Sequence, residues 1–304
     1  MKKISIVSSC FNEENNVEEL CKRVKAQMEK YESKYEWEQI LLDNHSDDGT
    51  AEKLREIASK DKHVKVILNA RNYGHIRSPY YGIINCFGDA VIYMASDLQD
   101  PPELIPQFIE KWEQGYKVAL GQKTQSEESK VMYRIRAMFY WFMEHIIDDG
   151  IVHIKQCTGF GLFDKSIVDI MRSTEDPYPY VRGFVCDVCY DKALIQYTQP
   201  LRKFGITKNN FYTMYDNAMI GVVKHSKVLL RLAVFSSVIM GMLSILIFLF
   251  ALMGKSSTGL FTSGFLFISA IQLFFIGIVG EYVGAIYTRV DKRPLVVEKE
   301  RINF

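Results

Sequence analysis

Residues 90–104, AVIYMASDLQDPPEL, join a short apolar run to an acidic turn and a proline pair. The apolar run, residues 90–95, predicts a buried strand, and a helix is expected at residues 103–114. Helix caps and turns explain many single carboxylates at strand ends. They do not easily explain three oxygen-bearing side chains packed into one turn, here Asp97, Gln99 and Asp100. We therefore expect a polar site after this strand.

Strand patterns alternate with helical patterns on both sides of this stretch. Strands are predicted at residues 2–8, 38–43, 64–68, 90–95 and 118–121, and helices at 12–30, 50–59 and 103–114. This alternation predicts an α/β fold with a mainly parallel sheet flanked by helices. Ligands of such sheets bind at the carboxyl ends of the strands.

The loops after the first two predicted strands are polar as well. Their sequences are SCFNE, residues 9–13, and DNHSDDGT, residues 43–50. The absence of G-x-G-x-x-G and G-x-x-x-x-G-K-[ST] argues against a dinucleotide oxidoreductase and a P-loop nucleotide triphosphatase. Carboxylates at strand ends can instead bind a nucleobase and ribose, or a hard cation that binds phosphate oxygens. Turn formation and capping of the next helix explain Asp48 and part of Asp47.

The distribution of charge predicts membrane helices. The 37 Lys+Arg and 36 Asp+Glu residues give a net charge of +1, which argues against a nucleic-acid partner. Residues 232–254 and 256–280 carry no charge at all. Each run meets the roughly 20 apolar residues that a helix needs to cross a bilayer. We predict two C-terminal transmembrane helices with cores at 234–253 and 264–283, the alternative being a buried hairpin in a soluble protein.

Basic residues flank the two apolar runs and set their orientation. They are Lys224, Lys227, Arg231, Arg289, Lys292 and Arg293. Positive flanks stay inside, so the N-terminal domain and the C-terminal tail are both expected in the cytoplasm. Residues 131–147 mix arginine with large apolar side chains and predict an interfacial helix, with a second at 210–229; a core helix is the alternative. The predicted boundaries are a cytoplasmic domain at 1–208, an interfacial linker at 209–230, a transmembrane hairpin at 231–290 and a tail at 291–304.

Several motifs follow one another in a fixed order. They are FNEEN at 11–15, LDNHSDDGT at 42–50, RNYG at 71–74, GDAVIYMASDLQDPPELI at 88–105 and YVRG at 180–183. Together they resemble the family 2 inverting glycosyltransferases. Within that family the match is to the polyprenyl-phosphate branch, which includes bactoprenol glucosyltransferases, aminoarabinose-type transferases and dolichol-phosphate mannose synthases. The stretch GIVGEYVGAIY, residues 277–287, resembles the second span of the bactoprenol type. The resemblance covers essentially the whole chain and implies a GT-A-like fold.

The resemblance also implies roles for individual residues. Nucleotide-sugar contacts are implied for Ser9, Phe11, Glu13, Asp43, Asn44, Arg71, Asn72 and Arg182. Asp97 and Gln99 are implied ligands of Mg²⁺ or Mn²⁺, and Asp97 and Asp100 are the candidate catalytic carboxylates. An equally weighted alternative makes Asp100 the cap of the helix after the proline pair. The lipid phosphate is expected among cationic side chains, for which the candidates are Lys123, Arg134, Arg136, Arg202 and Lys208.

Five positions depart from the family pattern. Ser9, Phe11 and Asn44 stand in place of Pro, Tyr and Asp, Ala95 in place of the first Asp of D-x-D, and Gly159 in place of an acidic residue. Mg²⁺ commonly takes one or two carboxylates plus substrate phosphates, so a single remaining Asp is compatible with a metal site. A phosphate nucleophile, whose second pKa is about 6, needs no strong general base.

The expected reaction is inverting transfer of a sugar from a nucleotide sugar to undecaprenyl or another polyprenyl phosphate. The resemblance favours UDP-glucose or UDP-N-acetylhexosamine as donor, the cell membrane as location and an envelope glycan as destination. Glu281, near the inner end of the second predicted span, is interpreted either as a helix-packing contact or as a contact within a homo-oligomer. Two alternatives stay open: a non-catalytic membrane protein that binds sugar nucleotides, and a transferase that forms a polysaccharide.

Overall fold

The computed structural model describes residues 1–125, 157–174, 181–188, 191–200, 257–290 and 294–304, together with Asp176 and Pro179. The chain divides into two compact units. The first comprises Met1–Tyr140, Val152–Asn210 and Lys292–Phe304, and the second comprises Trp141–Ile151 and Phe211–Asp291. The C-terminal residues therefore belong to the same unit as the N-terminal α/β region.

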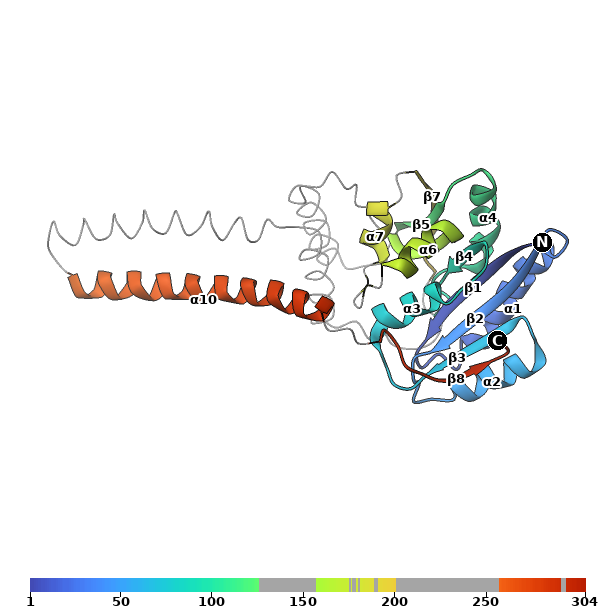
Figure 1. Ribbon diagram of the computed structural model, residues 1–304, viewed down its shortest axis with the longest axis horizontal. Coiled ribbons are helices and arrows are strands. Elements are labelled where there is room, and N and C mark those ends of the chain that lie inside the picture. Colours follow the sequence, from blue (N-terminus) through green and yellow to red (C-terminus); the bar gives the residue numbers. More distant parts are fainter. Residues whose placement is uncertain are drawn as a thin grey trace. The chain divides into compact units, whose positions relative to one another are not determined.

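An eight-stranded sheet in the order β7-β5-β6-β4-β1-β2-β3-β8 forms the first unit (Figure 1). Its strands are β1 (Lys2–Cys10), β2 (Tyr35–Asp43), β3 (Val64–Asn69), β4 (Ala90–Tyr93), β5 (Val118–Gln125), β6 (Cys157–Asp164), β7 (Lys192–Thr198) and β8 (Glu298–Ile302). β1 pairs in parallel with β2 and β4, β2 with β3, and β5 with β7. β6 is antiparallel to β4 and β5, and β8 is antiparallel to β3. The predicted α/β fold with a mainly parallel sheet is confirmed.

Helices cover both faces of this sheet. Their bounds are α1 (Val17–Met28), α2 (Thr50–Lys60), α3 (Gly74–Ile84), α4 (Ile105–Glu113), α6 (Lys165–Ser173) and α7 (Val181–Val188), with short 3₁₀ turns η1 (Glu29–Tyr31) and η2 (Pro102–Leu104). The apolar residues of α1, α2 and α4 join one core cluster, and those of α3, α6 and α7 join a second. Burial of these apolar stripes against the sheet is the main favourable contribution to folding.

Helix α1 begins five residues later than the sequence pattern indicates. Asn12 adopts a left-handed backbone with φ of 58°, which a continuing helix excludes. The predicted apolar face is nevertheless the buried one, because Val17, Leu20, Val24 and Met28 are all fully buried. Residues 12–16 therefore form a loop that remains available to the site.

Strand β8 closes the sheet on the side of β3 and comes from the last residues of the chain. Its sequence EKERI has alternating burial and no apolar run, so it gives no strand signal from sequence alone. Charged side chains of this kind are typical of edge strands, where they discourage pairing with other chains. Asn303 secures the end by donating hydrogen bonds to the carbonyls of Ala58 and Val64, at 2.7 and 2.8 Å.

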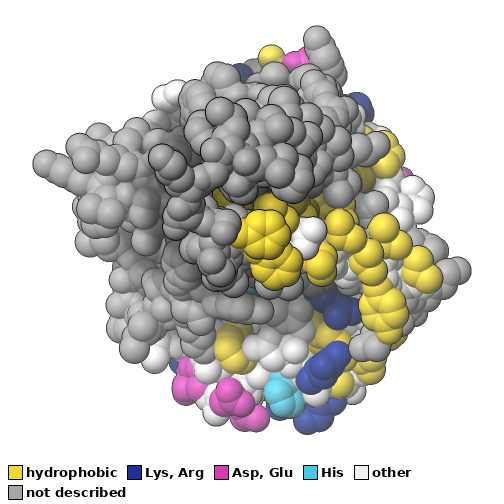
Figure 2. All heavy atoms as spheres, turned by 90° about the vertical axis from the view of Figure 1, so that its left-hand side faces the viewer, with side chains coloured by type: hydrophobic (Ala, Val, Ile, Leu, Met, Phe, Trp, Pro, Cys, Tyr) yellow, Lys and Arg dark blue, Asp and Glu magenta, His cyan; other side chains and the backbone are white. Residues whose placement is uncertain are grey.

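The second unit contains α10 (Ser257–Val290), one uninterrupted helix of 34 residues. Its segment Phe267–Tyr287 is long and apolar enough to cross a membrane, and it is the one such segment among the described residues. Large hydrophobic side chains along α10 are exposed, including Phe265, Phe274 and Val283, and hydrophobic side chains are prominent on the face drawn in Figure 2. The second predicted span is thus present as a helix. The first predicted span and both predicted interfacial helices lie outside the described residues.

Glu38 lies on β2, away from the strand end at Asp43 that carries the predicted site. Its buried ion pairs allow the stability of this part of the sheet to be tested. The residue is 4% exposed, and its carboxylate accepts hydrogen bonds from Lys3 and Ser5 and pairs with Lys65. Burial alone raises the pKa of Glu38, but the bonds from Lys3, Ser5 and Lys65 outweigh it and hold the pKa below its ordinary 4.5. The stabilisation is therefore fully present above the unfolded pKa and is lost as the pH falls through the lower folded value.

We expect Glu38→Ala to lower the free energy of unfolding by about 2 kcal/mol near neutral pH, because two lysines lose their partner. The loss should be constant above about pH 5 and shrink below that. Thermal melting in detergent at a series of pH values measures it. Glu36→Ala, an exposed glutamate on the same strand, is the matched control. A pH-independent difference between Glu38→Ala and the wild type would contradict the assignment.

Candidate active site

The loops that follow β1, β2 and β4 meet at one edge of the sheet. Asn12 Oδ1 accepts a hydrogen bond from the amide of Asp47, and the Asn12 amide donates to Ser46 Oγ, both at 2.9 Å. Ser96 Oγ donates to the carbonyl of Ser9 at 2.8 Å, which joins the β4 loop to the β1 loop. The three polar loops predicted from sequence are thus brought together as expected.

Each of these three loops holds one non-glycine residue in the left-handed region. The φ values are 58° for Asn12, 63° for His45 and 62° for Leu98. Such conformations cost of order 1–3 kcal/mol each and concentrate at functional sites. The strain therefore marks the same edge of the sheet that the polar side chains mark.

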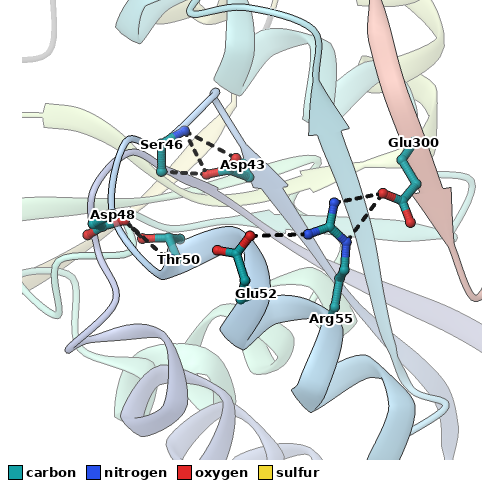
Figure 3. Close-up of polar contacts among 7 residues, drawn as sticks. All are labelled: Asp43, Ser46, Asp48, Thr50, Glu52, Arg55 and Glu300. Carbon is teal, nitrogen blue, oxygen red and sulfur yellow. Dashed lines mark hydrogen bonds and ion pairs between the residues drawn. The ribbon is translucent and has the colours of Figure 1, made fainter.

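Asp43 lies at the end of β2 with only 3% exposure. Burial raises the pKa of its carboxyl, while hydrogen bonds from the side chain and amide of Ser46 act in the opposite direction. Figure 3 shows these bonds, and it shows Asp48 turned instead toward Thr50 at the start of α2. Asp48 thus serves the helix start, as the sequence suggested, and Asp43 is the carboxylate that β2 holds at the site.

Asn44 connects the end of β2 to the RNYG loop. Its Nδ2 donates to Asn72 Oδ1 at 2.9 Å and to the Gly74 carbonyl at 3.3 Å. Its Oδ1 accepts from the amide of Tyr73 at 2.9 Å and from Asn69 Nδ2 at 3.1 Å. Both ends of a side chain that is only 4% exposed are therefore engaged with the loop. An aspartate here would lack the donor for two of these bonds, which gives the departure from the family pattern a physical reason.

The other predicted nucleotide contacts lie at the end of β1, in the loops that follow β1 and β3, and in α7. Ser9 Oγ lies 3.0 Å from Ser78 Oγ, which is fully buried. Phe11 is half-buried in the β1 loop, and Glu13 is buried there with its carboxylate bonded to Asn16 Nδ2. Exposed Arg71 lies with its guanidinium carbon 4.7 Å from the centroid of the Tyr73 ring. Arg182 lies within α7.

The turn after β4 carries the predicted metal ligands. Asp97 is half-buried, and its Oδ1 accepts a hydrogen bond from the backbone amide of Gln99 at 3.1 Å. Asp100 is buried, with Oδ2 accepting from the backbone amide of Ala95 and Oδ1 from the Tyr197 hydroxyl, both at 3.0 Å. Burial raises the pKa of Asp100, while the Ala95 bond and the charge of Lys123 oppose it.

Asp100 therefore connects the turn to β7 through its bonds to Ala95 and Tyr197. The alternative that it caps the following helix is wrong, because Pro101 occupies the cap position of η2 and makes no side-chain cap. Lys123, a predicted lipid-phosphate contact, donates to Gln199 Oε1 at 2.8 Å. The remaining candidates for that role, Arg134, Arg136, Arg202 and Lys208, lie outside the described residues.

Gly159 has a backbone reason for being glycine. Its φ is 92°, where a side chain is strained, although a Cβ would meet no atom within 4 Å. The acidic residue expected from the family pattern is therefore replaced at a position whose backbone favours glycine in this chain.

Sequence reasoning missed three residues that support the loops of the site through hydrogen bonds. Tyr197 on β7 bonds Asp100, and Asn69 and Ser78 bond each other at 3.2 Å behind the RNYG loop. Nothing in their local sequence marks them, since Tyr197 acts through a partner 97 residues away and the Asn69–Ser78 bond forms only once β3 and α3 are folded. Helix α3 also went unpredicted, and Pro79 inside it explains why.

A mainly parallel sheet flanked by helices, with acidic loops at the carboxyl ends of β1, β2 and β4, is the arrangement of a GT-A-like enzyme. Residues 5–170 match the family model described as glycosyl transferase family 2. An uncharacterised glycosyltransferase of Bacillus subtilis is 32% identical over 96% of this chain and 92% of its own length. The chain belongs to glycosyl transferase family 2.

Other relatives carry more informative names. A bactoprenol glucosyl transferase from a prophage of Shigella flexneri is 28% identical over 98% of both chains. Among solved structures, glucosyl-3-phosphoglycerate synthase of Mycobacterium tuberculosis, crystallised with Mn²⁺, UDP and phosphoglyceric acid, is 14% identical and superposes with a TM-score of 0.49 over 73% of this chain and 76% of its own.

We expect Asn44→Asp to loosen the RNYG loop, because the aspartate cannot donate to Asn72 or to the Gly74 carbonyl. The amides of residues 72–74 should exchange about tenfold faster, equivalent to about 1.4 kcal/mol of local opening free energy. Hydrogen–deuterium exchange with mass spectrometry measures this without any ligand. Asp47→Asn, an exposed change in the neighbouring turn, is the control. Unchanged exchange in Asn44→Asp would remove Asn44 from this role.

Proposed function

We propose that this enzyme transfers a sugar, with inversion, from a nucleotide sugar to a polyprenyl phosphate. The carrying observation is the match to bactoprenol glucosyl transferases over 98% of both chains, which includes the apolar C-terminal region. The architecture supports it, because one chain contains a polar site for a soluble donor and an exposed apolar helix suited to a lipid environment. We propose UDP-glucose as the first donor to test and UDP-N-acetylhexosamine as the second.

The donor is proposed to bind across the loops after β1 and β2. Asp43 offers a buried carboxylate to the hydroxyls of a nucleoside, and the Asn44 side chain holds the RNYG loop that presents Arg71. Arginine suits a diphosphate because its planar guanidinium donates several hydrogen bonds in a fixed geometry. Ser9, Phe11, Glu13, Asn72 and Arg182 complete the proposed nucleotide-sugar contacts.

Asp97 and Gln99 fit a divalent cation that the substrate helps to bind. They place a carboxylate and an amide in one half-buried turn. Within the described residues no group of three His, Cys, Asp or Glu side chains is placed to hold a metal ion. That donor set suits Mg²⁺ or Mn²⁺, which keep waters and take one or two carboxylates plus phosphate oxygens. When bound, the ion neutralises the charge that develops on the leaving diphosphate.

The acceptor is proposed to be its own nucleophile. A phosphate monoester is largely ionised near neutral pH, with a second pKa of about 6, so its oxygen attacks the anomeric carbon without a strong base. The glycine at position 159 is compatible with this chemistry. Lys123, Arg134, Arg136, Arg202 and Lys208 are the proposed contacts of the lipid phosphate.

We further propose two membrane crossings with the α/β unit in the cytoplasm. The chain leaves the first unit, passes through the second and returns to the first as β8. If α10 crosses the bilayer, an even number of crossings is needed to bring the chain back. The charge-free residues 232–254 supply the other crossing in this proposal. The proposed boundaries remain 1–208, 209–230, 231–290 and 291–304. Glu281 on α10 is the proposed oligomer contact.

The purified full-length enzyme should convert undecaprenyl phosphate to undecaprenyl-phosphate sugar. The assay contains Mg²⁺ or Mn²⁺ and one labelled nucleotide sugar at a time, with UDP-glucose expected to react fastest. Mass spectrometry should find one added sugar. NMR of the product should show a β linkage when the donor is α-linked, as inversion requires. Absence of labelled lipid with every common donor would refute the proposal, and a polymer would favour the polysaccharide-forming alternative.

Asp97→Asn should reduce the rate to below about a tenth of wild type, because it removes the one negatively charged ligand of the proposed pair and leaves two neutral amides. Electron paramagnetic resonance of Mn²⁺ in the presence of UDP should show weakened binding by the same variant. Asp47→Asn serves as control, since it removes an exposed carboxylate from a neighbouring loop. More than a tenth of the activity with unchanged Mn²⁺ binding would exclude Asp97 as a ligand.

A further inference from the structure

The C-terminal segment, residues 294–302, packs directly against the RNYG loop. The amide of Ala70, the residue before that loop, donates to the Val297 carbonyl at 2.9 Å. Val296 is only 6% exposed, so the segment is seated in the unit and does not lie loosely on it. β8 then continues along β3, the strand from which the loop emerges (Figure 1).

Arg77 also links the same segment to the loop. Its Nη2 donates to the Pro294 carbonyl at 2.6 Å. Its guanidinium carbon also lies 5.7 Å from the centroid of the Tyr73 ring, on which Arg71 stacks as well. Tyr73 is in turn held through its amide by Asn44 Oδ1. A short series of contacts thus runs from the C-terminal segment to the side chain that secures the loop.

This segment is also tied in sequence to the apolar helix. Only residues 291–293 separate Val290, the last residue of α10, from Pro294. The chain that leaves α10 therefore reaches the contact with Arg77 within four residues.

We propose that residues 294–302 are a positioning element of the donor site, acting through Arg77 and Ala70 on the RNYG loop. This inference rests on the proposed function, because it assigns the loop to donor binding. The element does not touch the donor. It fixes the loop from behind, so that ordering of the chain after α10 and affinity for the nucleotide are coupled.

The second anchor of the segment provides a matched control. Arg55 on α2 bonds Glu300 at 2.9 Å and also pairs with Glu52, as Figure 3 shows. It holds β8 as Arg77 holds Pro294, but it makes no contact with the RNYG loop in the described residues. A purely structural role of the segment predicts the same outcome for both arginines, whereas a positioning role separates them.

The experiment compares full-length Arg77→Ala, Arg55→Ala and a chain that ends at residue 293. Donor KM should rise about tenfold in Arg77→Ala and in the truncated chain, with kcat and lipid KM within about twofold of wild type. Arg55→Ala should lower the melting temperature as much as Arg77→Ala but raise donor KM by no more than about threefold, the allowance being for the electrostatic interaction of Arg55 with Asp43. Binding of UDP with Mn²⁺, measured by calorimetry, should weaken in parallel with KM.

Combining Arg77→Ala with the truncation distinguishes positioning from direct contact. A shared route predicts no further loss beyond either change alone, whereas an additive loss would place Arg77 on the donor itself and overturn the proposal. Equal effects of Arg55→Ala and Arg77→Ala would also overturn it. If the truncated chain does not melt cooperatively, Val296→Ala replaces it with the same expectation. Weakened UDP binding without sugar transfer to lipid would refute the proposed function and leave this inference standing.

Discussion

The parallel pairing of β1 with both β2 and β4 is the constraint on which the site depends. Cys10 aligns with Asp43 across one pair, and Val7 aligns with Tyr93 across the other. Because the three strands point the same way, the loops that follow them start at one edge of the sheet. The interior of β1 is fully buried, so its register is fixed by packing on both faces. The contacts between the loops after β1, β2 and β4 follow from that alignment.

Much of the polarity in the site holds backbone in place. Asn44 and Asp100 use their polar atoms to fix the RNYG loop and the turn of Asp97. The loops after β1, β2 and β4 hold Asn12, His45 and Leu98 in the left-handed region. An enzyme that stabilises developing charge needs dipoles and ligands fixed before the reaction, because reorganising them costs free energy at the transition state. In this structure the bonds of Asn44 and Asp100 fix the loop and the turn without a ligand.

The last strand of the sheet has consequences for how the protein assembles. β8 pairs with β3 across more than 200 residues, with the apolar α10 in between. The α/β unit therefore cannot complete its sheet until the whole chain is present. Pairing at such a separation is entropically costly and forms late in folding.

The sequence by itself determined the α/β class, the three acidic loops, the buried face of α1 and the apolar C-terminal region. These features are local, since strand runs, turn chemistry and helical periodicity need only a few neighbouring residues. Only the tertiary structure decided that Asn44 clamps the RNYG loop, that Asp100 bonds Ala95 and Tyr197, and that residues 298–302 form an edge strand. Each of these depends on partners from other strands, brought within 3 Å or so by sheet order and register. A charged pentapeptide carries no strand signal until an open edge accepts its backbone, and for that reason the sequence could not place β8.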